Sequence, residues 1–174
     1  MAHPDDVLVE MLDAAADRLA AYGYLLTGSQ SAGEELVQAA VVKVFGRRSR
    51  FQGPQAAEGY VRATMRTVHI DAMRRESTWR RLLPGEVRTE VGLDASDAFA
   101  QRDEVARLLT GLPRQQRTAV ILRFYDDLSY NEIAAAMGIS LGTVKRYLSD
   151  GLTLLGQRLD TKVERVAITE ASKR

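Results

Sequence analysis

The sequence contains no cysteine among its 174 residues and only two histidines. Without cysteine the chain has no disulfide, no thiol nucleophile and no thiolate zinc site. The two histidines, His3 and His69, leave little for a histidine metal centre, so we predict no metal and no cofactor. No apolar run approaches the roughly 20 residues that a membrane span needs, and the first residues lack the pattern of a signal peptide. We therefore expect a cytoplasmic protein that makes no membrane contact of its own.

The sequence also lacks the paired carboxylates, glycine-rich phosphate loop and nucleophile–base pair of an active site, so we predict that the protein is not an enzyme. What it does contain is a strong separation of charge within a net charge of +1. Residues 1–42 carry one basic and seven acidic side chains, whereas residues 43–81 carry ten basic and three acidic ones. A basic block of this size indicates a surface that faces a polyanion, with a solvated helix face as the alternative.

Helix-favouring residues dominate the chain and glycines lie at the ends of segments, which indicates an all-α protein. Apolar residues at helical spacing predict helices over about residues 7–26, 31–46 and 55–79. Ser31 is expected to cap the second helix, with Glu34 at the capping-box position. Six large residues of the third helix are expected to face a small core: Tyr60, Val61, Met65, Val68, Met73 and Trp79.

The best candidate for a linker begins at Leu82, because a Pro-Gly pair follows and no sustained period continues to residue 96. Beyond it, Val105 is expected on an inward stripe with Phe99, Leu108 and Leu109, and Pro113 is expected to start the next helix. The last residues are expected to be disordered, with a short helix that docks on a regulator as the alternative. We therefore predict two small helical domains joined by a flexible linker and followed by a tail: residues 1–81, 82–98, 99–160 and 161–174.

The sharpest local pattern lies at residues 128–148 and predicts a helix-turn-helix. Ser129 and Glu132 form a capping box, Gly138 lies where the tight turn needs a positive φ, and Ser140 caps the second helix. Five residues are then left to point outward, as reading of the DNA major groove requires: Leu141, Thr143, Lys145, Arg146 and Ser149. The alternative is an ordinary helical hairpin that binds nothing.

The pieces and their order resemble the sigma subunit of bacterial RNA polymerase, most closely the short two-domain extracytoplasmic-function (ECF) type. Residues 26–28 read Leu-Thr-Gly and residues 34–38 read Glu-Glu-Leu-Val-Gln, as in that family. Residues 66–75 carry its basic, Ile-Asp and Arg-Arg pattern, and residues 112–117 carry its Leu-Pro segment ahead of the helix-turn-helix. The resemblance covers about residues 8–159.

The resemblance implies a protein that binds core RNA polymerase and promoter DNA to initiate transcription, under the control of an anti-sigma factor. It assigns the core-polymerase contact to one helix: Glu34, Glu35, Leu36, Val37 and Gln38. It assigns the melted minus-ten element to the basic helix: Arg62, Arg66, Thr67, Arg74 and Arg75. It assigns the minus-thirty-five element to the second block: Arg114, Arg117, Ser140, Thr143, Lys145, Arg146 and Ser149. Asp71 is expected to orient a neighbouring arginine.

Two positions depart from the usual pattern of the family. Thr67 stands where Asn is usual, and Tyr60 stands where Trp is usual. Both lie in the minus-ten region, so the promoter preference there is left open. Two other functions also stay open: a free-standing helix-turn-helix regulator that binds duplex DNA by itself, and a non-initiating decoy that binds polymerase.

Overall fold

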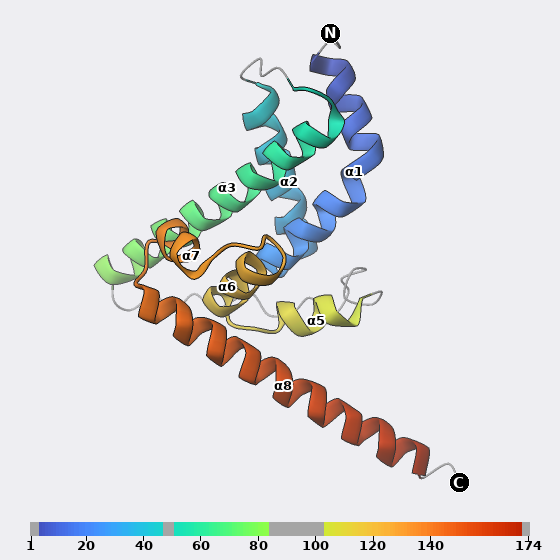
Figure 1. Cartoon of the computed structure of the whole chain (residues 1–174), viewed down its shortest axis with the longest axis vertical. Coiled ribbons are helices and arrows are strands. Elements are labelled where there is room, and N and C mark those ends of the chain that lie inside the picture. Colours follow the sequence, from blue (N-terminus) through green and yellow to red (C-terminus); the bar gives the residue numbers. More distant parts are fainter. Residues whose placement is uncertain (1–3, 47–50, 84–102, 172–174) are drawn as a thin grey trace. The chain divides into compact units, whose positions relative to one another are not determined.

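The computed structural model describes residues 4–46, 51–83 and 103–171, with side chains up to Thr161. These residues form seven α-helices and no strand, which confirms the all-α prediction (Figure 1). The chain divides into two compact units, Met1–Asp103 and Glu104–Arg174. The predicted linker lies outside the described residues from position 84 on, and its first residue, Leu82, is still helical.

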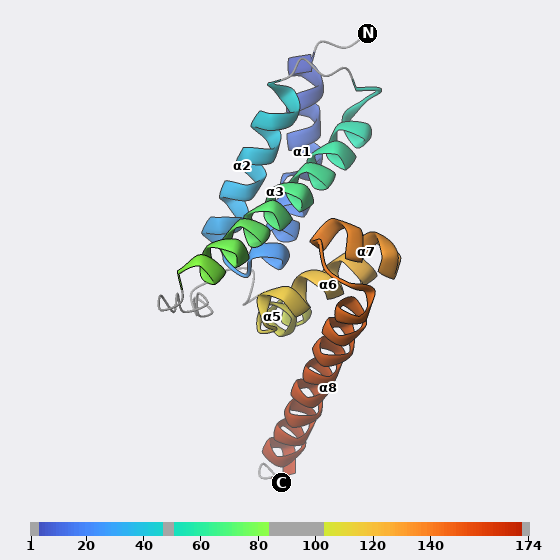
Figure 2. The same cartoon turned by 90° about the vertical axis from the view of Figure 1, so that its left-hand side faces the viewer.

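Unit 1 is a bundle of three helices, α1 (Pro4–Thr27), α2 (Gln30–Phe45) and α3 (Pro54–Leu82), each packed on the other two (Figure 2). The bounds agree with the three helices that the apolar spacing predicted. Large apolar side chains of α1 and α3 are fully buried between the helices, α2 adds Ala40, Leu36 and Val44, and this burial supplies most of the stability of such a small unit. Its main core residues are Met11, Leu19, Tyr22, Tyr24, Leu26, Ala40, Val61 and Met65.

Helices α1 and α2 approach so closely that their backbones touch at two glycines. A Cβ atom added to Gly23 would lie 2.6 Å from the carbonyl oxygen of Gly33. A Cβ atom added to Gly33 would lie 2.7 Å from the main-chain nitrogen of Tyr24. Real Cβ atoms do not come this near to backbone, so the crossing of the two helices depends on glycine at both positions.

The start of α2 differs from the prediction, because Ser29 and not Ser31 is the cap. Ser29 has extended backbone, and its hydroxyl accepts a hydrogen bond from the main-chain N–H of Ala32. Gly28 takes a positive φ of 78° and turns the chain here, so the helix begins earlier than the apolar spacing indicated. The expected capping box is therefore absent, and the Glu34 carboxylate instead accepts a hydrogen bond from the Gln30 amide.

Two of the residues predicted for the core of α3 are on its surface. Tyr60 and Trp79 are both 63% exposed, and that prediction was wrong for both. Tyr60 lies one position away from the stripe that packs against α1 and α2. Trp79 lies beyond Met73, the last buried residue of the helix. The stripe itself is Ala57, Val61, Met65, His69, Ile70 and Met73, with Val68 half-buried beside it.

Unit 2 consists of α5 (Glu104–Thr110), α6 (Arg114–Phe124), α7 (Tyr130–Met137) and α8 (Leu141–Ala171). Helix α8 packs against the other three. The core is drawn from every helix: Ala106, Ala119, Val120, Ile121, Leu122, Ile133, Met137, Val144 and Leu148.

Two expectations for unit 2 were wrong. Val105 is exposed, because α5 turns Ala106 and Thr110 toward the core instead, while Phe99 lies outside the described residues. The tail was expected to be disordered, but it is helical: α8 continues as far as Ala171. No glycine or proline interrupts the chain after Gly156, so nothing in the sequence ends the helix earlier.

Candidate functional site

The helix-turn-helix predicted for unit 2 is present in α7 and α8. The Ser129 hydroxyl accepts from the Glu132 main-chain N–H at 3.3 Å, and the Glu132 carboxylate accepts from the Ser129 N–H at 2.7 Å. Gly138 has φ 66° and ψ 37°, the left-handed conformation that ends α7. The next residue, Ile139, donates its N–H to the Ala134 carbonyl and closes the turn. These local bonds fix the angle at which α8 leaves α7.

The start of α8 turns short and basic side chains outward. Val144 and Leu148 are buried, which fixes the rotation of the helix. Lys145, Arg146 and Ser149 therefore lie on the exposed side. A helix that is anchored on one side and carries two cations on the other suits insertion into a DNA major groove.

Ser140 and Thr143 form the cap of α8 rather than a free polar pair. The Ser140 hydroxyl accepts from the Thr143 main-chain N–H at 3.1 Å and shares a hydrogen bond with the Thr143 hydroxyl at 2.9 Å. This confirms the expected cap at Ser140. Both hydroxyls are occupied locally, so their first role is to hold the start of the helix.

Arg117 is not available for a phosphate contact, so the assignment of this residue to DNA was wrong. Its side chain is only 6% exposed, and one terminal nitrogen donates to the main-chain carbonyls of Thr110 and Leu112 at 3.0 and 3.3 Å. The guanidinium thus holds the turn between α5 and α6 from inside the unit. Arg114, at the first position of α6, is half-buried.

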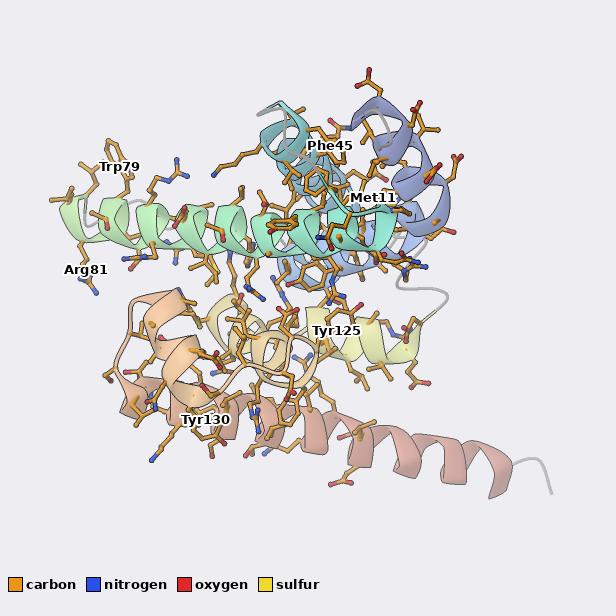
Figure 3. The ribbon with its side chains drawn as sticks, turned by 45° about the horizontal axis from the view of Figure 1, so that its top comes forward. Met11, Phe45, Trp79, Arg81, Tyr125 and Tyr130 are labelled. Carbon is orange, nitrogen blue, oxygen red and sulfur yellow. The ribbon has the colours of Figure 1, made fainter. Side chains whose placement is uncertain are left out.

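An exposed aromatic group at the end of α6 was missed in the sequence. Phe124 and Tyr125 at the end of α6 and Tyr130 at the start of α7 are all exposed. The two tyrosines are labelled in Figure 3. The Arg123 guanidinium lies 5.6 Å from the centre of the Tyr130 ring and donates to the Leu128 carbonyl at 3.1 Å, which orders the loop between α6 and α7. The sequence did carry a signal: Phe124 and Tyr125 directly precede Asp126 and Asp127. Two aromatic residues beside two acidic ones are unusual at a buried helix end.

In unit 1, the predicted polymerase-binding residues divide between the surface and the core. Glu34, Glu35 and Gln38 are exposed on α2, and Val37 is half-buried. Leu36 is buried against the other helices of the bundle, so its assignment to a direct contact was wrong. The outer face of α2 therefore presents two carboxylates and one amide.

Exposed Val42 extends this face of α2 by one turn beyond Gln38, and sequence reasoning missed it. Val42 lies about 200° around the helix from the buried residues Ala40 and Val44, but two further valines, Val37 and Val41, stand near it in the sequence, so its residue type alone did not mark it as exposed.

The arginines of α3 fall into two pairs. Arg62 and Arg66 are half-buried, and the Arg62 guanidinium lies 5.1 Å from the centre of the buried Tyr22 ring. Arg74 and Arg75 are exposed near the end of the helix. The first pair is held by the bundle, whereas the second pair is open to a ligand.

Two hydrogen bonds on the exposed side of α3 involve candidate residues. The Thr67 hydroxyl donates to the Ala63 carbonyl at 3.0 Å. Arg75 Nε donates to the main-chain carbonyl of Asp71 at 3.3 Å, so the orienting contact from Asp71 comes from its backbone. Thr67 is exposed and can still accept a hydrogen bond through its free lone pairs.

A two-point ion pair ties α1 to the start of α3. Arg18 donates to the two carboxylate oxygens of Glu58 at 3.1 and 2.8 Å. These hydrogen bonds are the main reason that the pKa of Glu58 lies below its ordinary value of 4.5, with further help from the charges of Arg18 and Arg62. Burial of the carboxyl acts in the opposite direction.

Three aromatic rings contact one another in series, each tilted against the next, between the end of α2 and the start of α3. Ring centres lie 5.2 Å apart for Phe45 and Phe51, and 5.5 Å apart for Phe51 and Tyr60. Phe51, just ahead of α3, is thereby held to the bundle.

The described residues contain neither a membrane-spanning helix nor a metal-binding cluster. None of the helices in the described ranges is long and apolar enough to cross a membrane. Within the same part of the chain, no group of histidine and acidic side chains is placed to hold a metal ion.

Two family models and several known proteins match this chain. The chain matches the family model for sigma-70 region 2 over residues 11–79 and the model for sigma-70, region 4 over residues 102–155. It is 33% identical over 134 residues to the RNA polymerase sigma-E factor of Streptomyces avermitilis, which covers 74% of this chain and 72% of that protein. It is 30% identical over 148 residues to the ECF RNA polymerase sigma factor SigE of Mycolicibacterium smegmatis, covering 82% of this chain and 57% of that protein.

A solved structure shares the fold. The sigma factor RpoE of Bartonella quintana, crystallised with the anti-sigma factor NepR, matches with a TM-score of 0.53 and 22% identity. The match covers 88% of this chain and 96% of that one. With both sigma-70 regions matched in order, and with relatives similar over most of their length, the chain belongs to the RNA polymerase sigma factors of the ECF type.

Proposed function

We propose that this sigma factor divides its work between two units: unit 1 binds core RNA polymerase and the minus-ten element, and unit 2 binds the minus-thirty-five element. The observation that carries the proposal is the capped helix-turn-helix of unit 2, which leaves Lys145 and Arg146 on the open side of α8. The contacts with core polymerase and with the minus-ten element are then assigned to the surfaces of unit 1.

The core-polymerase contact is made by Glu34, Glu35 and Gln38 on α2, with Val37 at its edge. The two carboxylates suit a basic helical surface, and the amide both donates and accepts hydrogen bonds. Leu36 makes no contact of its own with the polymerase, because it is buried; its packing in the bundle holds this face of α2 in place.

The minus-ten contact is made by the exposed side of α3. Arg74 and Arg75 pair with phosphates, since a guanidinium matches a phosphate at two points. Thr67 offers a short hydroxyl at the same face, whereas Arg62 and Arg66 lie at its margin and contribute positive charge. Guanidinium planes also stack on bases that have left the duplex, which favours the melted strand.

The minus-thirty-five contact is made by the first turns of α8. Lys145, Arg146 and Ser149 reach base edges and phosphates in the major groove. Ser140 and Thr143 set the start of the helix, and Arg114 approaches a phosphate from the first turn of α6.

The remaining parts of the proposal follow from the family. The protein has no catalytic role of its own, because polymerisation belongs to core polymerase, and it acts in the cytoplasm where that enzyme works. An anti-sigma factor holds it inactive by covering the same surfaces, as the complex of the structurally similar RpoE with NepR suggests.

The test is transcription by purified core polymerase on fragmented genomic DNA of the source organism, with and without the protein. We expect new, discrete start sites. The double variant Lys145→Ala, Arg146→Ala should lose them while still binding core polymerase. The matched control is Arg107→Ala, an exposed arginine on α5, and it should keep them.

Other outcomes favour the alternatives. Tight binding to core polymerase without new starts would make the protein a decoy. Binding to duplex DNA alone, without binding to core polymerase, would make it a free-standing regulator and would overturn the assignment of Glu34, Glu35 and Gln38.

A further inference from the structure

One acidic residue lies on the side of α8 that is assigned above to DNA. Asp150 is exposed and follows Ser149 directly, four residues after Arg146. Around a helix of 3.6 residues per turn it lies about 40° from Arg146 and about 200° from the buried Leu148. Asp150 therefore belongs to the open side of the helix that carries Arg146 and Ser149.

The packing of α8 keeps Asp150 on this side. The next residue, Gly151, is buried against α6, and a Cβ atom added to it would lie 3.0 Å from Val120 Cγ2. Val144 and Leu148, two turns and one turn earlier, are buried as well. Three buried positions thus fix the rotation of the helix, so Asp150 cannot turn into the unit.

No contact among the described residues accounts for an aspartate at this position. Asp150 is the tenth residue of α8, too far from the first turn to cap the helix or to gain from its dipole, and aspartate is a weak helix former. Within the described part of the chain its carboxylate has neither a hydrogen bond nor an ion pair. The guanidinium carbon of Arg146 lies instead 5.6 Å from the centre of the Tyr147 ring. The carboxylate is thus open to a ligand.

The DNA major groove offers a carboxylate one well-matched base. A carboxylate accepts hydrogen bonds and donates none. Guanine presents only acceptors there, and thymine presents an acceptor and a methyl group, so neither can donate to it. Adenine presents its amino group beside the acceptor N7, whereas cytosine presents an amino group with no acceptor next to it. Cytosine is therefore the base that a carboxylate on this helix favours.

The charge of Asp150 makes it suited to selecting a base rather than to general DNA affinity. Phosphates repel a carboxylate, so an acid on this side of α8 weakens binding to DNA of any sequence. Lys145 and Arg146, exposed on the same side, supply the attraction to phosphates. Asp150 raises affinity only where a base donates a hydrogen bond to it, and it lowers affinity elsewhere.

We propose that Asp150 reads a cytosine of the minus-thirty-five element by accepting a hydrogen bond from the N4 amino group of that base. This inference rests on the function proposed above for α8. The two cations of the helix supply affinity, and Asp150 adds a preference for one base.

The test selects promoters from a library with a randomised minus-thirty-five element, using holoenzyme reconstituted from core polymerase and the full chain. The wild type should select cytosine at one position, and Asp150→Ala should lose that preference and keep the others. Asp150→Asn should move the preference at this position from cytosine to adenine, because asparagine binds the N6 and N7 atoms of adenine at two points. The matched control is Asp160→Ala, an exposed aspartate of the same helix, which should leave every preference unchanged.

Each outcome decides the question. Wild-type preferences in either Asp150 variant, or a change of affinity that is equal for all sequences, would overturn the inference and leave the proposed function intact. Loss of preference at the same position in Arg146→Ala would also overturn it, because Asp150 would then act by orienting that arginine. A wild-type holoenzyme that selects no base in this element would overturn the function proposed for α8 and this inference with it.

A binding measurement supplies a second arm. Two promoters that differ only in this base, cytosine or thymine, should differ in Kd by about 10-fold for the wild type and by less than about 2-fold for Asp150→Ala. The melting temperature of the variant should be at least that of the wild type, because Asp150 is exposed and alanine favours the helix. A difference that stays near 10-fold in the folded variant would overturn the inference.

Discussion

The two units hold their binding surfaces in different ways. Unit 1 displays its surfaces on the sides of long helices of 16 and 29 residues, whose positions are set by contacts between distant parts of the chain. Unit 2 displays its surface on α8 just after the eight-residue helix α7, and hydrogen bonds between near neighbours set the ends of both. Damage to packing should therefore displace the surfaces of unit 1 as a whole, whereas unit 2 should be most sensitive at its caps and turns.

The largest effect is expected where the two helix backbones of unit 1 touch. Gly33→Ala would place a Cβ atom 2.7 Å from backbone and should destabilise the protein by about 2–3 kcal/mol, the cost of overpacking a rigid contact. The measurement is urea unfolding followed by circular dichroism. The variant should also bind core polymerase more weakly, because α2 carries Glu34 and Gln38.

The matched control for this prediction is Gly59→Ala on α3. No atom lies within 4 Å of the added Cβ, so the change should stabilise the helix by about 0.5–1 kcal/mol. Equal effects of the two substitutions would show that the close crossing of α1 and α2 does not matter.

The next effect concerns the buried arginine of unit 2. Arg117→Met should destabilise the protein by about 2 kcal/mol, because the carbonyls of Thr110 and Leu112 lose their donors inside the unit. Arg107→Met, at an exposed position, should change the free energy of unfolding by less than about 0.5 kcal/mol. Wild-type stability of Arg117→Met, together with reduced DNA affinity, would restore the original assignment of Arg117 to phosphate.

A smaller effect is expected at the turn of the helix-turn-helix. Gly138→Ala should cost about 1–2 kcal/mol, because alanine is strained at a φ of 66°. Gly138→Asn should cost less, since asparagine tolerates this conformation. Thermal unfolding would rank the two. Equal melting temperatures of the two variants would show that the left-handed backbone at Gly138 is not the reason why this position requires glycine.

The smallest effect concerns the ion pair between Arg18 and Glu58. The folded-state pKa of Glu58 is lowered, so the pair stabilises the fold fully above the unfolded value of about 4.5, and this stability is lost as pH falls through the folded pKa. Arg18→Gln should remove up to about 1 kcal/mol at pH 7, because Arg18 is largely exposed. The difference from wild type should shrink as the pH is lowered below 4.5. A constant difference across that range would contradict this role.

Local signals in the sequence were enough to predict the helix-turn-helix. The capping box at Ser129, the left-handed Gly138 and the cap at Ser140 each depend on residues within four positions of one another. The helix bounds of unit 1 were also predictable, because apolar spacing is a property of a single helix.

What the sequence did not reveal depends on contacts across the fold. Arg117 looked like a surface residue by type, and the resemblance to the family assigned Leu36 to a contact, yet tertiary packing buries both. Tyr60 and Trp79 looked like core residues by type, yet the bundle of unit 1 packs through a different stripe and ends at Met73. A linear pattern gives the period of a helix, but the rotation that its neighbours impose comes only from the assembled unit.

The central claim, that recognition is divided between the units, is tested most directly by footprints of the holoenzyme at a mapped promoter. Protection of the minus-thirty-five duplex from DNase I reports on unit 2, and permanganate reactivity of melted thymines reports on unit 1. Lys145→Ala with Arg146→Ala should lose upstream protection, by about 1–3 kcal/mol of binding per lost base contact, and retain core binding. Arg74→Ala with Arg75→Ala should keep upstream protection and lose most of the permanganate signal. Equal loss of both signals in both variants would contradict the division.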